Sequence, residues 1–292
     1  MARQPMSDGI CSNKQDTSGG CSFGSPCFFT TEGNTTTGER GKTVAEELIR
    51  INKLLSDAGI CSRREADRLV EQKRVTVDGR ILEMGSKVSP TADIRVNGKP
   101  IRKEERKVLL MLNKPRGIVC TMERRERDSV VRFMKYPLRV YPVGRLDKDS
   151  EGLLLLTNQG DLVNRIMRAG NRHEKEYVVT VDKEIDADFL EKMSIGVPIL
   201  DTITRPCTVE YVGKYTFRII LTQGLNRQIR RMCEYFGYEV KKLKRVRIMN
   251  LTLGKLPVGK YREVTGEELN GLMKLLENSS SLSQKELNGQ TE

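Results

Sequence analysis

The sequence has no long hydrophobic run. A helix that crosses a membrane needs about 18 or more consecutive apolar residues, and no stretch of that kind is present. The first residues also lack a compact apolar stretch behind a basic start, which argues against a secretory signal. We therefore expect a cytoplasmic protein without a membrane partner.

Motifs for metals and common cofactors are also missing. None of the seven cysteines forms a Cys-x-x-Cys pair, and the single histidine, His173, has no cysteine nearby. We therefore expect no zinc or other metal, and the lack of a P-loop or Rossmann fingerprint predicts no cofactor. Scattered cysteines in odd number are typical of reduced thiols. His173 is interpreted as a surface or RNA-facing residue.

Negative charge is in short supply. The 292 residues include 51 Lys and Arg against 39 Asp and Glu, which gives a formal net charge of +12. Such an excess attracts phosphate backbones and favours an RNA partner, although anionic membranes attract the same charge. The length predicts about two domains.

Two folded units between two tails are predicted. Residues 1–44 are rich in Gly, Ser and Thr, so they cannot bury enough apolar surface to offset the entropy of ordering. Residues 279–292 look similar, and both tails are expected to be disordered. The first folded unit spans residues 45–101 and the second spans 105–278, and we expect a monomer.

The first unit is predicted to be a helix pair followed by hairpins. Gly59 ends the first helix, and Ser62 begins the second with Glu65 three residues later, as in a capping box. Asp78-Gly79 and Asn97-Gly98 are typical hairpin turns. The apolar face of the first helix consists of Leu48, Ile51, Leu54 and Leu55.

Basic side chains are dense on this small unit. A charge cluster is usually only a solvated face. A module of roughly 55 residues has little core to spare, however, so we interpret this face as a surface that binds RNA phosphates. The residues concerned are Arg50, Lys53, Arg63, Arg64 and Arg68.

Strands and helices alternate without a regular rhythm in the second unit. This pattern predicts an α+β domain with helices packed on a largely antiparallel sheet. The predicted strands are Val108–Leu112, Leu153–Thr157, Tyr177–Val181 and Tyr215–Thr222. The predicted helices are Leu162–Arg168, Ala187–Ser194, Arg227–Phe236 and Glu267–Glu277.

The run from Gly144 to Asn158 says most about chemistry. Its Arg145-Leu146-Asp147 triplet lies on a turn directly before an apolar strand. A buried strand is a rigid base from which a turn can present a carboxylate into a cleft. On these residues alone, a solvated acidic turn is the alternative.

A second cluster lies on the helix predicted from Arg227. Arg227, Arg230 and Arg231 share one face, and arginines near a helix N-terminus form an anion site unless they are merely solvated. The anion could be an RNA phosphate, Asp147, or both. Asn226 is expected to cap this helix and Gly237 to end it, with a buried face of Ile229, Met232, Cys233 and Phe236.

Four segments resemble the motifs of one enzyme family. They are Lys114–Gly117, Gly144–Asn158, Glu174–Tyr177 and Gln223–Met232. They resemble the pseudouridine synthases that modify ribosomal RNA, in the RsuA/RluB/RluF family, and the likeness is strongest to the RluF type. It covers nearly everything except the two ends, and the Gly/Ser/Thr/Cys-rich start is not part of the family pattern.

The resemblance implies a reaction and roles for single residues. The reaction is site-specific isomerisation of uridine to pseudouridine, in a mixed sheet divided by an RNA cleft. Asp147 would be the catalytic carboxylate, and Tyr177 would stack on the flipped uracil and help to remove its C5 proton. Arg230 would pair with Asp147, with Arg227 as the alternative partner. The residues implied to bind RNA or place the loop are Arg145, Arg227, Arg231 and Lys114.

The resemblance also implies the partner. Ser62, Arg63 and Ala66 match the Ser-Arg-x-x-Ala pattern of the S4 domain, a small RNA-binding module. The RluF likeness implies large-subunit (23S) ribosomal RNA, with a tRNA anticodon loop as an alternative. The rival function is a non-catalytic RNA-binding protein or ribosome assembly factor that retains the fold. The implied catalytic set argues against that rival, because a pure binder would not need it.

Overall fold

The computed structural model describes residues 48–102, 106–123 and 125–279. The tail predicted at 1–44, nearly all of the tail predicted at 279–292 and three of the seven cysteines lie outside these residues. The other four cysteines are free thiols. Within the described ranges, no helix is long and apolar enough to cross a membrane.

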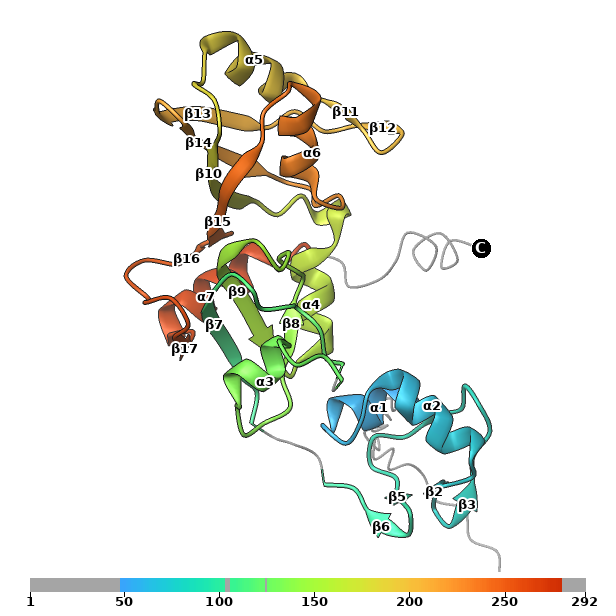
Figure 1. Cartoon of the computed structure of the whole chain (residues 1–292). Helices are drawn as coiled ribbons and strands as arrows, with labels where there is room; N and C mark the ends of the chain where they lie inside the picture. The colour runs from blue at the N-terminus through green and yellow to red at the C-terminus, as the bar shows by residue number, and fades with distance from the viewer. Residues whose placement is uncertain (1–47, 103–105, 124, 280–292) are drawn as a thin grey trace, which may run out of the picture. The chain divides into compact units, whose positions relative to one another are not determined.

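The first unit contains two helices and a small antiparallel sheet (Figure 1). Apolar residues of the helices share one core with the sheet, whose strand order is β3-β2-β5-β6. A separate strand pair joins β1 to β4. The elements are α1 (Ile51–Asp57), α2 (Arg63–Glu71), β1 (Ile49–Arg50), β2 (Val75–Val77), β3 (Arg80–Ile81), β4 (Lys87–Val88), β5 (Ile94–Val96) and β6 (Lys99–Pro100).

Most local signals in this unit form as the sequence predicts, and of the predicted capping box the structure shows the Ser62 half. Ser62 caps α2, and its Oγ accepts a hydrogen bond from the Glu65 backbone N–H at 3.2 Å. The turns Asp78-Gly79 and Asn97-Gly98 have positive φ at both residues, which hairpins of this type require. The placement of Leu48 on the helix is wrong. Its side chain is 55% exposed, because the chain is still extended there and α1 begins three residues later.

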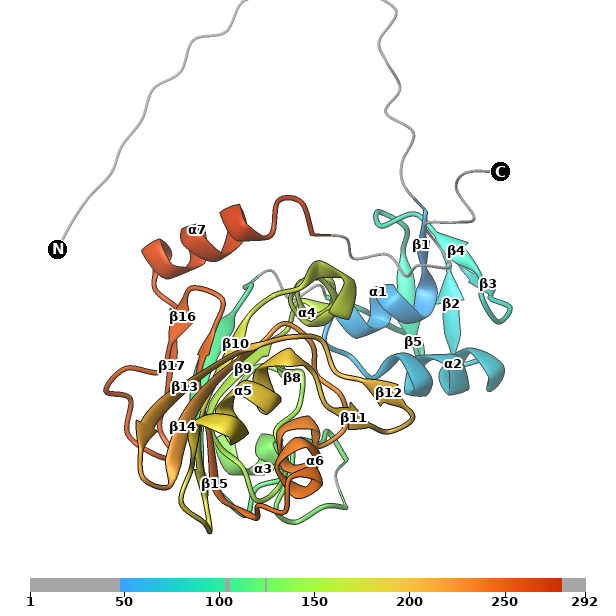
Figure 2. The same ribbon diagram turned by 90° about the horizontal axis from the view of Figure 1, so that it is seen from above.

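A nine-stranded sheet forms the centre of the second unit (Figures 1 and 2). Its order is β13-β14-β10-β15-β9-β7-β17, with β16 beside β15 and β8 beside β9. Neighbouring strands are antiparallel except β15 and β9, which meet in a short parallel pairing. The predicted α+β fold is confirmed. The strands are β7 (Leu109–Lys114), β8 (Tyr141–Val143), β9 (Glu151–Thr157), β10 (Lys175–Val181), β13 (Thr208–Gly213), β14 (Thr216–Leu221), β15 (Val240–Ile248), β16 (Leu251–Thr252) and β17 (Tyr261–Glu263).

The helices cover the two halves of this sheet differently. α5 (Ala187–Ile195) and α6 (Gln228–Tyr235) share a core with β10, β14 and β15. α4 (Gly160–Met167) and α7 (Gly266–Leu275) pack on one face of β7 and β9, and α3 (Val130–Met134) packs on the other. β9 is buried on both faces. Its four leucines therefore follow one another directly, without the alternation of apolar and polar residues that a half-exposed strand shows. A separate hairpin consists of β11 (Pro198–Ile199) and β12 (Thr202–Ile203).

Strand β15 joins the two halves of the sheet, and the sequence does not predict it. Five of its nine residues are Lys or Arg, a composition that conceals strand propensity. The strand is nevertheless central, since it pairs with β10 along most of its length and with β9 at the junction. Two of its arginines have surroundings that only the folded structure provides: Arg245 is buried, and Arg247 has carboxylate partners.

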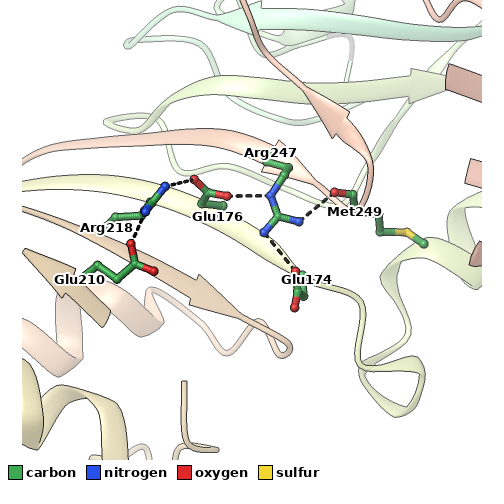
Figure 3. A network of polar contacts seen from close by, with 6 residues as sticks. All are labelled: Glu174, Glu176, Glu210, Arg218, Arg247 and Met249. Atoms are coloured by element: carbon green, nitrogen blue, oxygen red, sulfur yellow. Dashed lines mark hydrogen bonds and ion pairs between the residues drawn. The ribbon is translucent and has the colours of Figure 1, made fainter. Parts of the chain in front are cut away.

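Some of those partners form a charge ladder, which we define as Glu174, Glu176, Arg247, Arg218 and Glu210 (Figure 3). The Arg247 guanidinium donates to Glu176 at 2.6 Å and to Glu174 at 3.0 Å. Arg218 lies 3.7 Å from Glu176 and also contacts Glu210. The charge ladder thus crosses β15, β10, β14 and β13, and such cross-strand pairs favour one register of the strands.

Candidate active site

A cavity of about 630 Å³ lies beside the junction of β15 and β9. Its walls come from the loop before β9, from β10 and β15, and from the segment that leads into α6. Five residues predicted from the sequence line it together: Arg145, Asp147, Tyr177, Arg227 and Arg230. The volume is in the range of small-molecule sites, so one nucleotide fits where these segments converge.

Backbone contacts hold the loop that carries Asp147. The Lys114 ammonium donates to the Ser150 carbonyl at 2.8 Å, and the Gly117 N–H donates to the Lys148 carbonyl at 2.8 Å. The Arg230 guanidinium adds a bond to the Asp149 carbonyl at 3.3 Å. These contacts come from two distant parts of the chain, so the position of the loop depends on the complete fold.

Lys114 is not an RNA contact in this structure. Its side chain is fully buried, and its ammonium bonds to the carbonyls of Pro115 and Ser150. An RNA phosphate cannot reach a group without exposed surface. The prediction is therefore wrong for Lys114. The sequence does not show that the side chain of this last residue of β7 lies on a buried face of the sheet.

Two arginines face the Asp147 carboxylate. Arg227 Nη1 lies 3.6 Å and Arg230 Nε lies 3.9 Å from Asp147 Oδ2. Arg227 is largely exposed, whereas the Arg230 side chain is only 10% exposed and donates to the Val240 carbonyl at 3.1 Å. Burial and the neighbouring Arg227 lower the pKa of Arg230. Both of the partners that the sequence left open therefore lie within reach of the carboxylate.

The start of α6 differs from the prediction. The N-cap residue is Arg227, with a left-handed φ of 49°, and Asn226 makes no capping bond. Asn226 instead accepts hydrogen bonds from Arg231 through its backbone and side-chain oxygens. Gly237 follows the helix with positive φ, as predicted. The Arg231 guanidinium is directed toward this turn, and its RNA contact stays a prediction.

Tyr177 belongs to both the cavity and the core. It is half-buried, lines the cavity and packs against the apolar clusters on both halves of the sheet. It shares a face of β10 with Val179 and Val181, as alternation requires. The ring can therefore stack on a base while its edge stays anchored.

Three further cations line the cavity, and the sequence assigns no function to any of them: the exposed Lys148 and the buried Lys175 and Arg245. Lys175 is 5% exposed and Arg245 is 1% exposed. Burial and the neighbouring Arg245 lower the pKa of Lys175 to about 8. Lys175 lies inside a recognised motif, but nothing in its spacing indicates burial. Arg245 lies in the strand that the sequence does not predict.

The remaining predicted groups lie elsewhere. His173 is half-buried, with its Nε2 2.9 Å from Ser279 Oγ, and burial and Lys175 lower its pKa. In the described part of the chain, no group of three His, Cys, Asp or Glu residues could hold a metal. The first unit exposes four of its five predicted RNA-binding residues, and Lys53 is half-buried: the five are Arg50, Lys53, Arg63, Arg64 and Arg68.

Comparison with known proteins connects this geometry to one family. Residues 108–235 match the family described as RNA pseudouridylate synthase, and residues 49–94 match the S4 domain. The chain is 57% identical over 235 residues to the dual-specificity RNA pseudouridine synthase RluF of Escherichia coli strain K12, covering 80% of this chain and 81% of the relative.

A more distant relative and a solved structure agree. The ribosomal large subunit pseudouridine synthase B of Bacillus subtilis strain 168 is 37% identical, over 80% of this chain and 98% of the relative. A crystal structure of a pseudouridylate synthase superposes with a TM-score of 0.57 at 28% identity, covering 77% of this chain and 99% of the other.

Proposed function

Because the chain belongs to the RNA pseudouridylate synthase family, we propose that it isomerises uridine in large-subunit ribosomal RNA, with Asp147 as the catalytic carboxylate. The substrate follows from the Bacillus relative, whose name specifies the large ribosomal subunit. The RluF relative is described as dual-specific, so a second RNA is part of the proposal, and a tRNA anticodon loop is the candidate. Such an enzyme works in the cytoplasm.

The reaction needs little beyond the residues of the cavity. The bond between C1′ and N1 breaks, the uracil turns, and a bond forms between C1′ and C5. The proton on C5 leaves and N1 gains one, so atoms balance without a cofactor. An anionic Asp147 either attacks C1′ or stabilises a cationic sugar, and Arg227 and Arg230 lie within 4 Å of its carboxylate. Tyr177 stacks on the flipped base.

The observation that carries this proposal is the carboxylate itself. Asp147 is half-buried in a nucleotide-sized cavity, with two arginines within 4 Å. A carboxylate on a solvated turn would have neither the cavity nor the paired cations. The arrangement therefore supports a group that works on a bound nucleotide.

Substitution of this carboxylate tests the proposal. Asp147→Asn keeps the size of the side chain but removes its charge, so isomerisation should fall by at least about 10³-fold while RNA affinity stays nearly unchanged. The measurement is single-turnover release of tritium from ribosomal RNA that carries 5-tritiated uridine. Asp149→Asn is the matched control, because it changes an exposed carboxylate two residues along the same loop. Normal tritium release by Asp147→Asn would refute the assigned role.

A further inference from the structure

Three buried cations share one face of the sheet at the cavity, and we call them the cationic floor: Arg245 and Lys175 line the cavity, and Lys114 lies in the same row of the sheet as Arg245. The strand register places two of them in one transverse row. Lys114 pairs with Gly152, Gly152 pairs with Arg245, and Arg245 pairs with Tyr177. Lys175 lies two residues before Tyr177 on β10 and shares its face. The floor therefore lies directly alongside the ring expected to hold the base.

A β-bulge turns Arg245 toward this face. Residues two apart on a strand normally share a face, but the register of β15 against β10 shifts between the partners of Glu176 and Tyr177. Arg247 pairs with Glu176 and belongs to the charge ladder (Figure 3), which lies on the outer face, the face of β10 opposite to Tyr177. Arg245 pairs with Tyr177 and lines the cavity. The bulge thus separates two arginines that would otherwise point the same way.

The cationic floor makes no close ion pair in the described part of the chain, although the carboxylates of Asp147 and Asp149 act on Lys114 from a greater distance. The bonds of its three cations go to carbonyl oxygens: Lys114 to Ser150, Lys175 to His173, and Arg245 Nε to Leu153. Among the described residues none of the three forms an ion pair, and Arg245 Nη2 is buried without any hydrogen-bond partner. Burial lowers the pKa of both lysines. Buried charges without counter-charges cost stability, so this arrangement favours a site that receives an anion.

The proposed reaction generates such an anion. When the C1′–N1 bond breaks, its electron pair leaves with the uracil, and the negative charge spreads from N1 to O2 and O4. We propose that the cationic floor, through Arg245 and Lys175, stabilises this detached uracil anion until C5 bonds to C1′. The C5 proton then leaves and N1 takes one up, which restores a neutral base. This inference rests on the proposed function.

The role predicts an effect on turnover without an effect on RNA binding. Arg245 lines the cavity with 1% of its surface exposed and has an unpaired buried Nη2, so we expect it to act when negative charge develops on the base rather than on neutral uridine. Arg245→Met keeps an unbranched side chain and removes the charge. We expect kcat for tritium release to fall roughly 10-fold to 100-fold with KM unchanged. The Tm should stay the same or rise, because an unpaired buried cation is lost.

Arg247→Met is the matched control. It removes an arginine two residues away on the same strand, but one that belongs to the outer charge ladder. It should lower the Tm and leave kcat of the folded protein unchanged. Arg245→Lys, which keeps the charge, should recover part of the lost turnover. A purely structural role for Arg245 would give the opposite result in Arg245→Met: a lowered Tm with normal kcat, which would overturn the proposal.

A better leaving group supplies a second readout. RNA with 5-fluorouridine carries a base whose anion is more stable, because fluorine withdraws electrons. We compare the rate of Arg245→Met with that of the unaltered protein, and follow 5-fluorouridine by its loss from a nuclease digest. The loss of rate caused by Arg245→Met should be smaller with 5-fluorouridine than with uridine. An equal deficit would overturn the proposal. If Arg245→Met does not fold, Lys175→Met takes the same test.

The outcomes separate this inference from the proposed function. Unaltered protein that releases no tritium, or Asp147→Asn protein that releases it normally, would count against the proposed function and thereby against the cationic floor. Normal kcat in Arg245→Met beside an inactive Asp147→Asn would overturn the cationic floor alone.

Discussion

At the residue scale, Asp147 owes its position to contacts on its loop backbone rather than to contacts on its carboxylate. The contacts from Arg227 and Arg230, at 3.6 Å and 3.9 Å, are ion pairs too long for hydrogen bonds, whereas the loop backbone is held at 2.8 Å by Lys114. The carboxylate oxygens thus stay available to the sugar. The sequence indicated the carboxylate and both arginines, but it could not show that Lys114 supports the loop from inside.

Lys175 should make stability depend on alkaline pH. The pKa of Lys175 in the folded protein is about 8, below the ordinary value of 10.5, because of burial and the charge of Arg245. His173 is a further titratable group beside Lys175. Between these values the unfolded chain binds more protons, so stability rises with pH across that window. Lys175→Met should be more stable near neutral pH and show a smaller rise, because the buried Lys114, whose pKa is also lowered, still contributes. Urea unfolding across the window measures both effects, with the exposed Lys242→Met as control. An equally large rise in Lys175→Met and in the unaltered protein would contradict the assignment.

Tyr177 should tolerate loss of its hydroxyl better than loss of its ring. Tyr177→Phe keeps the packing and the stacking surface, so its Tm should match the unaltered protein. Tyr177→Ala should lose stability, because the ring packs on two apolar clusters, and should also lose about 1–3 kcal/mol of base stacking. If the hydroxyl handles the C5 proton, Tyr177→Phe should stall after the glycosidic bond breaks. Full turnover by folded Tyr177→Ala would remove Tyr177 from the site.

At the element scale, the sequence predicts β9 and fails on β15 for one physical reason. The leucines of β9 are buried on both faces, so composition alone reveals them. Of the basic residues of β15, Arg247 depends on the charge ladder and Arg245 on the cavity and a bulge, which are all products of tertiary structure. The two strands meet at Gly152, which pairs with Arg245 of the cavity wall. This junction is therefore the part of the site that the sequence could not predict.

Gly152→Ala should damage that junction. Gly152 has a φ of +102°, and an added Cβ would overlap the backbone carbonyl of Arg245 on β15. The backbone strain of a non-glycine residue at this φ alone costs of order 1–3 kcal/mol. The overlap of the added Cβ with the Arg245 carbonyl must in addition push β9 and β15 apart. We expect a clear loss of Tm and of turnover. Gly213→Ala is the control, because it has open space and no positive φ. Equal effects of the two substitutions would show that the close approach is unimportant.

At the scale of the whole molecule, basic charge and catalysis are divided between two units. The S4 domain carries an exposed basic surface, and the synthase domain carries the cavity. Composition and local signals predicted the division, the helix pair and the α+β class. The exact boundaries of the two units remain predictions. The RNA contacts of Arg50, Arg63, Arg64 and Arg68 also remain predictions.

Removal of the first unit should reduce affinity and spare the chemistry. A protein without residues 1–101 should bind ribosomal RNA more weakly and with a flatter dependence on salt, because each lost phosphate contact reduces the slope. It should still turn over a short RNA at high concentration. Binding titrations at several salt concentrations, together with tritium release, measure both. An unchanged salt slope would show that the first unit does not contact phosphates.

The most direct test of the central claim is a map of pseudouridines in ribosomal RNA. Cells that lack this protein are compared with cells that carry it unaltered or as Asp147→Asn. If Asp147 isomerises large-subunit RNA, at least one pseudouridine of the large subunit should disappear without the protein. It should return with the unaltered chain and stay absent with Asp147→Asn. An identical map in all three would contradict it, as would restoration by Asp147→Asn.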